Sequence, residues 1–476
     1  MKPSIVWFRD DLRTTDNPAL RAAADDGAAV ALYVLDEESP GIRPHGGASR
    51  WWLHHSLVTL REELAALGVP LVLRRGSAAG IVPETATAMG AGSLYWNRRY
   101  GEPERMLDAG VKTSARESGM HAESFQASLL HEPWAVTTKQ GGPFKVFTPF
   151  WRTVSGLDFR EPLEAPEPDC GFSGPLPESE ELDSWGLLPR NPDWSAGLSE
   201  SWRPGSAQAH ELLDDFVERG LADYSVNRDR PDLPGSSRLS PFLRWGQLSP
   251  FEVWHAQQRR RRELGDGVAV FAAELGWREF CWHQYFHHPD LATANLRPGF
   301  DHYPWAWPGG QGAGAQGAGS PEAPGGSRQE GAAADTALLR AWQEGRTGFP
   351  MVDAGQRQLW HTGWMHNRVR MVSASLLVKN LGIHWQVGEQ WFWDTLVDAD
   401  PASNPANWQW VAGSGADASP FFWIFNPETQ AAKFDPHGSY VGQWIPELAT
   451  ADYPEPVVDL KASRREALDA YGNLPR

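Results

Sequence analysis

Cysteine is nearly absent from this chain, which has only Cys170 and Cys281 in 476 residues. Two cysteines cannot build a disulfide framework or a cysteine metal cluster, so the sequence predicts no metal site. Long apolar runs are also missing, and the N-terminus lacks the apolar core of a signal peptide. The sequence therefore predicts a cytoplasmic protein without a membrane span.

Positive charge is scarce overall, because the formal net charge is −17. This charge argues against broad, non-specific nucleic-acid binding, which depends on phosphate neutralisation. The segment from Ala354 to Gly388 is an exception, since it has no Asp or Glu and carries Arg357, Arg368, Arg370 and Lys379. Such a segment indicates a narrow anion or DNA site, and a chance gap in acidic residues is the alternative.

Apolar runs separated by helical patterns occupy the first 130 residues. The predicted strands are Ser4–Phe8, Ala29–Leu35, Val69–Leu73 and Ser93–Trp96, and a helix is expected over Arg50–Gly68. This alternation predicts a parallel, Rossmann-like α/β sheet with helices on both faces. No GxGxxG motif follows the first strand, so a standard dinucleotide site is not supported there.

The remainder of the chain has few strand signals. Residues 155–205 are rich in Pro, Glu, Ser and Gly, which is typical of a surface linker. We expect an α/β domain over 1–130, a linker over 131–205 and a larger all-α domain over 206–476. Within the last domain, the Gly/Ala/Pro tract at about 308–334 is expected to be a disordered loop.

Two helical segments carry the same unusual stripe of residues at spacing i, i+3, i+4, i+7. The first consists of Glu274, Trp277, Arg278 and Cys281, and the second of Trp364, Asn367, Arg368 and Met371. A plain core stripe would not contain Glu, Asn and Arg, because burying them unpaired is costly. The two faces either meet in a satisfied polar network or line a pocket.

Three shorter features are weak when taken singly. Ser236, Ser237 and Ser240 could cradle a phosphate at a helix start, or simply cap that helix. Asp398 and Asp400 could accept hydrogen bonds from a ligand, or cap a turn. The motif NWQWVAG then places two tryptophans, Trp408 and Trp410, on either side of one glutamine.

Taken together and in order, the motifs VWFRDDLR, DNPAL, SSRLSP, WREF, GWMHNRVRM, DADPASN and NWQWVAG are highly specific. The chain resembles the photolyase/cryptochrome family, and most closely its bacterial class I cyclobutane pyrimidine dimer photolyases. The resemblance implies an N-terminal antenna domain and a helical FAD-binding domain. It also implies light-driven repair of cyclobutane pyrimidine dimers, by electron transfer from excited reduced FAD to a flipped-out dimer.

The resemblance assigns a role to each matching residue. For FAD it implies contacts from Tyr224, Ser236, Ser237, Arg238, Leu239, Ser240, Arg278, Asn367, Arg370, Asp398, Ala399, Asp400 and Asn404. For the dimer and DNA it implies contacts from Arg228, Glu274, Trp277, Asn367, Arg368, Met371, Trp410 and Gln430. Catalysis is expected from Glu274 and Asn404, with Asn404 beside flavin N5, and electron relay to the flavin from Trp408 and Trp385.

Some positions depart from the family pattern. The outer relay tryptophan has no counterpart near Ala332, and the candidates to replace it are Trp305, Trp307, Trp360, Trp391 and Trp393. Trp423 stands where relatives usually have Arg, and Phe271 stands where some have Trp. Pro103, beside Glu104, replaces an Asn of folate-binding relatives, which leaves the antenna pigment open among methenyltetrahydrofolate, 8-hydroxy-5-deazaflavin and none.

Three hypotheses of function follow. The leading one is a monomeric repair enzyme acting on UV-damaged DNA. A cryptochrome-like photoreceptor that binds FAD without repairing DNA is the main alternative. A flavin-independent nucleotide-binding protein is the third, and it predicts a colourless protein.

Overall fold

The computed structural model describes residues 2–308, 325–418 and 423–475, and the chain forms two compact units. Unit 1 comprises Met1–Ser225, Ser236–Pro289 and Val397–Asp400. Unit 2 comprises Val226–Gly235, Asp290–Leu396 and Pro401–Arg476. In the part of the chain that the structure describes, no helix is long and apolar enough to cross a membrane.

Unit 1 contains a five-stranded parallel sheet with strand order β3-β2-β1-β4-β5. The strands are β1 (Ser4–Phe8), β2 (Ala29–Leu35), β3 (Leu71–Arg75), β4 (Ser93–Asn97) and β5 (His121–Phe125). Ser4 pairs with Ala29 on one side and with Ser93 on the other, which fixes the register around the central strand. The order reverses between β1 and β4, where ligands of open α/β sheets commonly bind.

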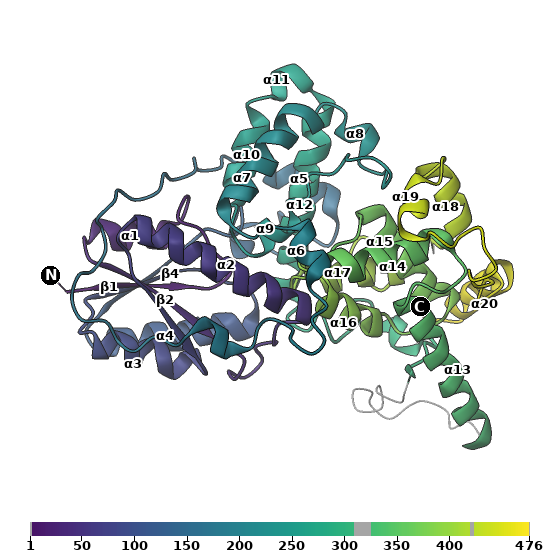
Figure 1. The fold of residues 1–476 in the computed structure, drawn as a ribbon, viewed down its shortest axis with the longest axis horizontal. Coiled ribbons are helices and arrows are strands. Elements are labelled where there is room, and N and C mark those ends of the chain that lie inside the picture. The colour runs from purple at the N-terminus through teal and green to yellow at the C-terminus, as the bar shows by residue number, and fades with distance from the viewer. Residues whose placement is uncertain (1, 309–324, 419–422, 476) are drawn as a thin grey trace. The chain divides into compact units, whose positions relative to one another are not determined.

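Helices cover both faces of this sheet, because its strands are apolar on both sides. Side chains from one face, including Ile5, Trp7 and Leu94, form a core with α3 (Ala78–Ala88) and α4 (Glu102–Glu117). Figure 1 shows α1 (Pro18–Asp25) and α2 (Gly47–Ala66) on the opposite face. The predicted parallel α/β architecture is therefore confirmed.

The fifth strand was not predicted, because its sequence HAESF lacks an apolar run. Only Ala122 in it is fully buried, as expected of a strand at the edge of a sheet. The predicted strand Val69–Leu73 is shifted to Leu71–Arg75 in the structure. Register of this kind depends on tertiary pairing and is not visible in a short apolar run.

The rest of unit 1 is helical apart from long connecting segments. Its helices are α5 (Phe147–Val154), α6 (Ala196–Ser201), α7 (Ser206–Asp215), α8 (Tyr224–Asn227), α9 (Ser240–Arg244), α10 (Pro250–Gln258), α11 (Arg261–Leu264) and α12 (Asp266–His287), with α8 ending in unit 2. Short 3₁₀ helices lie at Pro133–Ala135 and Leu182–Trp185, and a π-helical turn at Phe216–Gly220.

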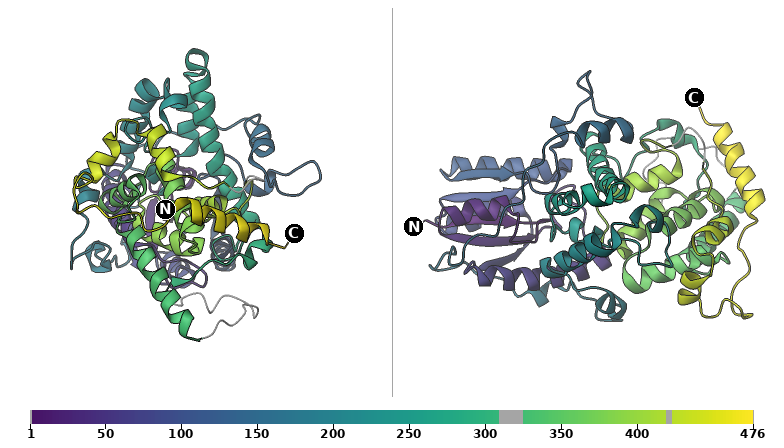
Figure 2. Two further views of the ribbon diagram at one scale, coloured as in Figure 1. Left: turned by 90° about the vertical axis from the view of Figure 1, so that its right-hand side faces the viewer. Right: turned by 90° about the horizontal axis from the view of Figure 1, so that it is seen from above.

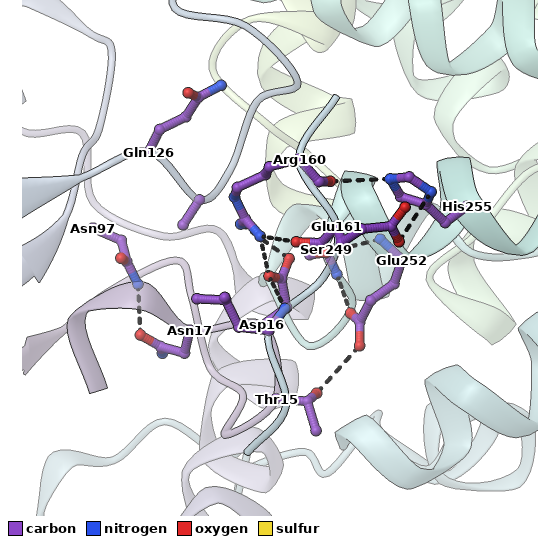
Figure 3. A network of polar contacts seen from close by, with 12 residues as sticks. Thr15, Asp16, Asn17, Asn97, Gln126, Arg160, Glu161, Ser249, Glu252 and His255 are labelled. Atoms are coloured by element: carbon purple, nitrogen blue, oxygen red, sulfur yellow. Dashed lines mark hydrogen bonds and ion pairs between the residues drawn. The ribbon is translucent and has the colours of Figure 1, made fainter. Parts of the chain in front are cut away.

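A polar network fastens the connecting segment after α5 to both the sheet and α10 (Figure 3). Arg160 forms an ion pair with Asp16, and its backbone carbonyl lies 3.0 Å from Nε2 of His255 on α10. Glu252 closes a capping box with Ser249 at the start of α10 and accepts a hydrogen bond from Thr15. Segments far apart in sequence are thereby linked within unit 1.

Unit 2 is helical, and its helices can be followed from three sides in Figures 1 and 2. They are α13 (Gly325–Gln343), α14 (Pro350–Thr362), α15 (Asn367–Ser375), α16 (Trp385–Thr395), α17 (Ser403–Ala412), α18 (Pro427–Phe434), α19 (Ser439–Trp444) and α20 (Leu460–Gly472). Among the described residues, a 3₁₀ helix lies at Pro298–His302 and a π-helical turn at Leu376–Asn380. The predicted all-α second part of the chain is confirmed.

The expected disordered loop at 308–334 needs a correction at its end. Residues 309–324 lie outside the described residues, but 325–334 belong to α13. The helix continues through Ala333, Ala334, Leu338 and Leu339, which are strong helix formers. The glycines that precede these residues are typical of a loop, so the start of the helix was not predicted from the sequence.

Candidate functional site

Most side chains of the predicted stripe on α12 are only partly buried, as expected of residues that face a ligand. Glu274, Trp277 and Arg278 are half-buried, whereas Cys281 is buried. The Trp277 ring stacks on Phe147 with the ring centroids 3.8 Å apart and the planes at 9°. One face of this indole is therefore fixed by protein before any ligand binds.

Arg278 is held by a buried acid that the sequence analysis did not single out. Its Nη1 lies 3.1 Å from Oε1 of Glu279, whose other oxygen accepts a hydrogen bond from the Leu130 amide at 2.8 Å. Burial raises the pKa of Glu279 to about 7, although the Arg278 charge opposes this rise. The ion pair orients the guanidinium predicted to contact the cofactor.

The serine-rich turn before α9 has an unusual backbone conformation. Arg238 has φ of +55°, in the left-handed region, and its guanidinium lies 4.3 Å from the ring centroid of Trp202. Burial lowers the pKa of Arg238. The turn bends the chain so that Ser236, Ser237 and Ser240 surround an arginine held by an aromatic ring.

The segment Val397–Asp400 is attached to α9 and the residue that follows it. Ser240 Oγ donates to Asp398 at 2.6 Å, Arg244 Nε donates to the Ala399 carbonyl at 2.7 Å, and Trp245 Nε1 donates to the Val397 carbonyl at 3.0 Å. The structure thus brings together two predicted cofactor segments that are about 160 residues apart in sequence. It places the Asp398 carboxylate against a hydroxyl of the serine-rich turn.

Tyr224, the remaining predicted cofactor residue of unit 1, is buried in an aromatic cluster. Its ring meets Phe216 and Phe271 edge-on, with centroid distances of 5.4 and 5.2 Å. Phe271, at the position where some family members have Trp, is therefore a packing partner of Tyr224.

In unit 2, Asn367, Arg368 and Met371 of the second predicted stripe lie on α15, but Trp364 precedes the helix, so the predicted helical spacing is wrong for this residue. Asn367 is exposed, and Arg368, Arg370 and Met371 are half-buried. Arg370 Nε donates to the Met365 carbonyl at 2.7 Å, which ties this arginine to the turn before the helix. The family resemblance also implies that Arg370 pairs with Asp398, which stays a prediction.

Asn404 on α17 is buried, and its amide orientation is fixed by Glu389 on α16. Nδ2 donates to the Glu389 carbonyl oxygen at 3.0 Å and to its carboxylate at 2.8 Å. With the amide nitrogen committed to these acceptors, Oδ1 is the atom left to accept from a ligand. Sequence reasoning missed Glu389, although it is the first acid after the acid-free segment.

The three residues of the Trp-Gln-Trp motif have different environments. Trp408 is buried against Phe392 and Trp342, with centroid distances of 4.9 and 6.2 Å. Trp410 is half-buried and meets Trp423 edge-on at 6.2 Å. Residues two apart on a helix face different sides, so the two indoles cannot share one role.

Gln409, between them, is fully buried and acts as a structural staple. Its Nε2 donates to the carbonyls of Leu291 and Ala294 at 2.7 and 2.8 Å, and its Oε1 accepts from the Leu296 amide at 2.9 Å. Gln409 thereby holds α17 against the segment 291–296. The glutamine of the NWQWVAG motif was visible in the sequence, but only the two flanking tryptophans were interpreted.

His384 connects Trp385, the predicted middle relay residue, to two further aromatic rings. His384 lies 5.7 Å from Trp385, 5.0 Å from Trp305 and 4.1 Å from Trp307 between ring centroids. Burial lowers the pKa of His384 to about 3, so this ring is neutral at physiological pH. Trp391 instead stacks on Trp360, an indole that is 54% exposed, at 5.9 Å.

Each unit, taken by itself, offers polar groups that suit part of a flavin dinucleotide. Unit 1 offers hydroxyls and an arginine, which suit phosphates, and the Asp398 carboxylate, which suits ribose hydroxyls. Unit 2 offers a buried amide whose carbonyl oxygen is oriented by Glu389. In the antenna region, burial raises the pKa of Glu104, and Pro103 packs close to Gly41.

Comparison with known proteins agrees with this reading. Residues 4–168 match the family model described as DNA photolyase, and residues 271–452 match the FAD binding domain of DNA photolyase. The deoxyribodipyrimidine photo-lyase of Agrobacterium fabrum is 44% identical over 502 residues, covering 100% of this chain and 98% of the relative. Cryptochrome-1 of Arabidopsis thaliana is 34% identical, covering 94% of this chain and 63% of that protein.

Among solved structures, a bacterial class III photolyase from Agrobacterium tumefaciens has a TM-score of 0.88 and 42% identity, covering 99% of this chain and 97% of that one. These relatives confirm the expected enzyme class at the level of the family, and the second model confirms the FAD-binding domain. The chain therefore belongs to the photolyase/cryptochrome family.

Proposed function

We propose that this protein repairs cyclobutane pyrimidine dimers in DNA in a light-driven reaction. The observation that carries the proposal is 44% identity over the whole chain to an enzyme named deoxyribodipyrimidine photo-lyase. The retained Glu274, Trp277, Asn367, Met371 and Trp410 support it, since these residues match the family's dimer pocket.

Reduced FAD, when bound, would supply the electron that splits the dimer after excitation by light. Asn404 would present Oδ1 to the N–H at flavin N5, and Glu389 prevents the amide from flipping. Tyr224 and the turn of residues 236–240 would hold the phosphates and the ribityl chain, and Asp398 would lie near the flavin ring. Such fixed dipoles stabilise transient charge without reorganising during the reaction.

The substrate residues would replace what a flipped dimer loses on leaving the helix. Photolyases extrude their target nucleotide, and aromatic stacking is worth about 1–3 kcal/mol per base. Trp277, whose rear face is covered by Phe147, and Trp410 would form the walls. Glu274 and Asn367 would hydrogen-bond the pyrimidine edges.

DNA contacts would come from Arg228 and Gln430, and Arg368 would belong to the pocket that receives the dimer. These residues belong to an otherwise acidic protein, which favours binding at one damaged site over general DNA binding. The proposed partner is UV-damaged DNA, bound by a cytoplasmic monomer.

Trp408 and Trp385 would pass electrons inward to reduce FAD. For the outer member we propose Trp307 or Trp305, because both rings pack on His384 beside Trp385. The Gly-rich tract follows these two residues in the sequence, and the usual position near Ala332 holds no tryptophan. The stacked pair Trp360 and Trp391 is the alternative candidate for the outer end of the electron relay.

The domain division proposed from sequence is an antenna domain over 1–130, a linker over 131–205 and an FAD domain over 206–476. Methenyltetrahydrofolate and 8-hydroxy-5-deazaflavin stay open as antenna pigments.

The photolyase class is a separate question. The sequence motifs favoured class I, whereas 42% identity to a structure named class III photolyase favours class III.

A cryptochrome-like photoreceptor is the second candidate, supported by the 34% identity to a plant cryptochrome. The two functions separate in one assay, in which chemically reduced protein is illuminated with blue light on dimer-containing DNA. Dimer loss supports repair. Intact dimers with fully reduced flavin would reject the enzyme in favour of the photoreceptor.

A further inference from the structure

Asp229, in the short segment of unit 2 before the serine-rich turn, lies between two arginines from different parts of the chain. Its Oδ2 is 2.8 Å from Nη2 of Arg368 on α15, and its Oδ1 is 4.0 Å from Nε of the adjacent Arg228. Each carboxylate oxygen therefore faces a different guanidinium. Both arginines are proposed above to contact the damaged DNA, Arg228 outside the dimer pocket and Arg368 within it.

Arg368 is held on further sides. Its guanidinium carbon lies 4.6 Å from the ring centroid of Phe434, and its backbone amide donates to Nδ1 of His366, the N-cap of α15. Burial lowers the pKa of His366 to about 4, so this ring is neutral at physiological pH. His366 therefore brings no positive charge to Asp229, and the positive groups that face Asp229 are the two arginines.

The side chains of this cluster are only partly exposed, at 33% for Asp229, 17% for Arg368 and 23% for Arg228. Partial burial weakens solvent screening, so the pair is more than a surface salt bridge. A carboxylate beside phosphate-binding arginines also opposes DNA binding electrostatically. The Asp229 carboxylate favours DNA binding only if the orientation that it gives the two arginines stabilises the complex by more than this repulsion destabilises it.

We infer that Asp229 is a positioning residue that holds Arg228 and Arg368 as one rigid pair of cations for neighbouring phosphates of damaged DNA. A guanidinium fork binds phosphate well when it is already oriented, because less side-chain freedom is then lost on binding. This inference rests on the proposed function, which supplies the DNA ligand. It adds an acidic residue to a site otherwise described by its basic and aromatic groups.

The sign of one substitution separates this inference from simple electrostatics. Asp229→Asn removes a negative charge, so charge alone predicts tighter binding of a dimer-containing duplex. Positioning predicts weaker binding, by about 10-fold, and a shallower dependence of log affinity on log salt by about one unit if one phosphate contact is lost. Glu428→Gln, which makes the same charge change at an exposed position of α18, is the matched control.

Asp229→Glu keeps the charge and is expected to recover most of the lost affinity. Flavin content and unfolding midpoint are measured for every variant, and Asp229→Glu tests the geometry should Asp229→Asn fold poorly. Equal or tighter binding by Asp229→Asn, with wild-type repair intact, would overturn the positioning role alone. Failure of the wild type to bind or repair dimers would overturn the proposed function and this inference together.

Discussion

The amide of Asn404 and the carboxylate of Glu389 form a buried pair in which the amide nitrogen donates at 2.8 Å. A second bond to the Glu389 carbonyl, at 3.0 Å, uses the other hydrogen of the same amide. Asn404 comes from α17 and Glu389 from α16, so the orientation of this amide depends on how two helices pack. Its free oxygen is therefore set by tertiary structure.

Glu389→Gln should loosen this orientation, because a neutral amide can offer either its oxygen or its nitrogen to Asn404. We expect FAD to stay bound, its reduced form to re-oxidise in air several-fold faster, and dimer repair to decline. Absorbance at the flavin band after anaerobic reduction measures the re-oxidation. Asp394→Asn on the same helix is the control, and equal re-oxidation rates in both variants would contradict the role of Glu389.

Gly388→Ala should displace Trp408. A Cβ atom at Gly388 would lie 2.2 Å from Cη2 of the Trp408 ring, so the indole must move. Overpacking of this kind costs about 1–3 kcal/mol in the free energy of unfolding, and photoreduction should slow as well. Gly442→Ala is the matched control, because that helical site has no atom within 4 Å and should be neutral or slightly stabilising.

Trp408→Phe should slow flavin photoreduction and leave repair by pre-reduced enzyme unchanged, because Phe oxidises much less readily than Trp. If the outer relay member packs on His384, Trp307→Phe slows photoreduction more than Trp360→Phe does. Transient absorption after a flash measures both rates. The opposite ranking would assign the exit to the exposed pair Trp360 and Trp391.

Glu274→Ala should lower the repair yield by about 10-fold while flavin content stays at the wild-type level. Losing a charged hydrogen bond to the substrate costs roughly 1.5–3 kcal/mol, which is the reason for this magnitude. Repair per absorbed photon is measured with saturating dimer-containing DNA. Glu263→Gln, an exposed acid on the neighbouring α11, serves as the comparison.

Stability should depend on pH through His210 and Glu252, whose side chains approach to 3.0 Å. The hydrogen bond to Glu252 raises the pKa of His210, although burial opposes it. A raised folded-state pKa stabilises the protein fully below about pH 6.5, the unfolded value, and the effect is lost as pH rises through the folded value. Since the His210 side chain is 37% exposed, the effect should stay under about 1 kcal/mol.

The measurement compares urea unfolding midpoints of wild type and His210→Gln at pH 6 and pH 8. Wild type should be more stable than the variant at pH 6, and the gap should narrow at pH 8. The capping box of Ser249 and Glu252 (Figure 3) should stay intact in this variant, because it uses Oε2 of Glu252 whereas His210 approaches Oε1. His302→Gln, at an exposed position, should show no such change in the gap.

Local sequence patterns predicted much of the fold. Strands β1, β2 and β4 were predicted because buried parallel strands are continuous apolar runs, and the second part of the chain was predicted to be helical because it has few strand signals. The edge strand β5 and the start of α13 were not predicted, because a half-exposed strand and a glycine-rich helix have weak local signals. Motif order was sufficient for the family, because seven matches in sequence leave little room for chance.

By itself, the sequence determined the α/β and all-α classes, the family, and the identities of the residues proposed to bind FAD and DNA. Only the tertiary structure decided how those side chains are held: Asn404 by Glu389, Arg278 by Glu279, Arg368 by Asp229, and Gln409 by the segment 291–296. Except for Arg278 and Glu279, these pairs join positions distant in the chain. Their hydrogen bonds depend on distances of about 3 Å that no local pattern encodes.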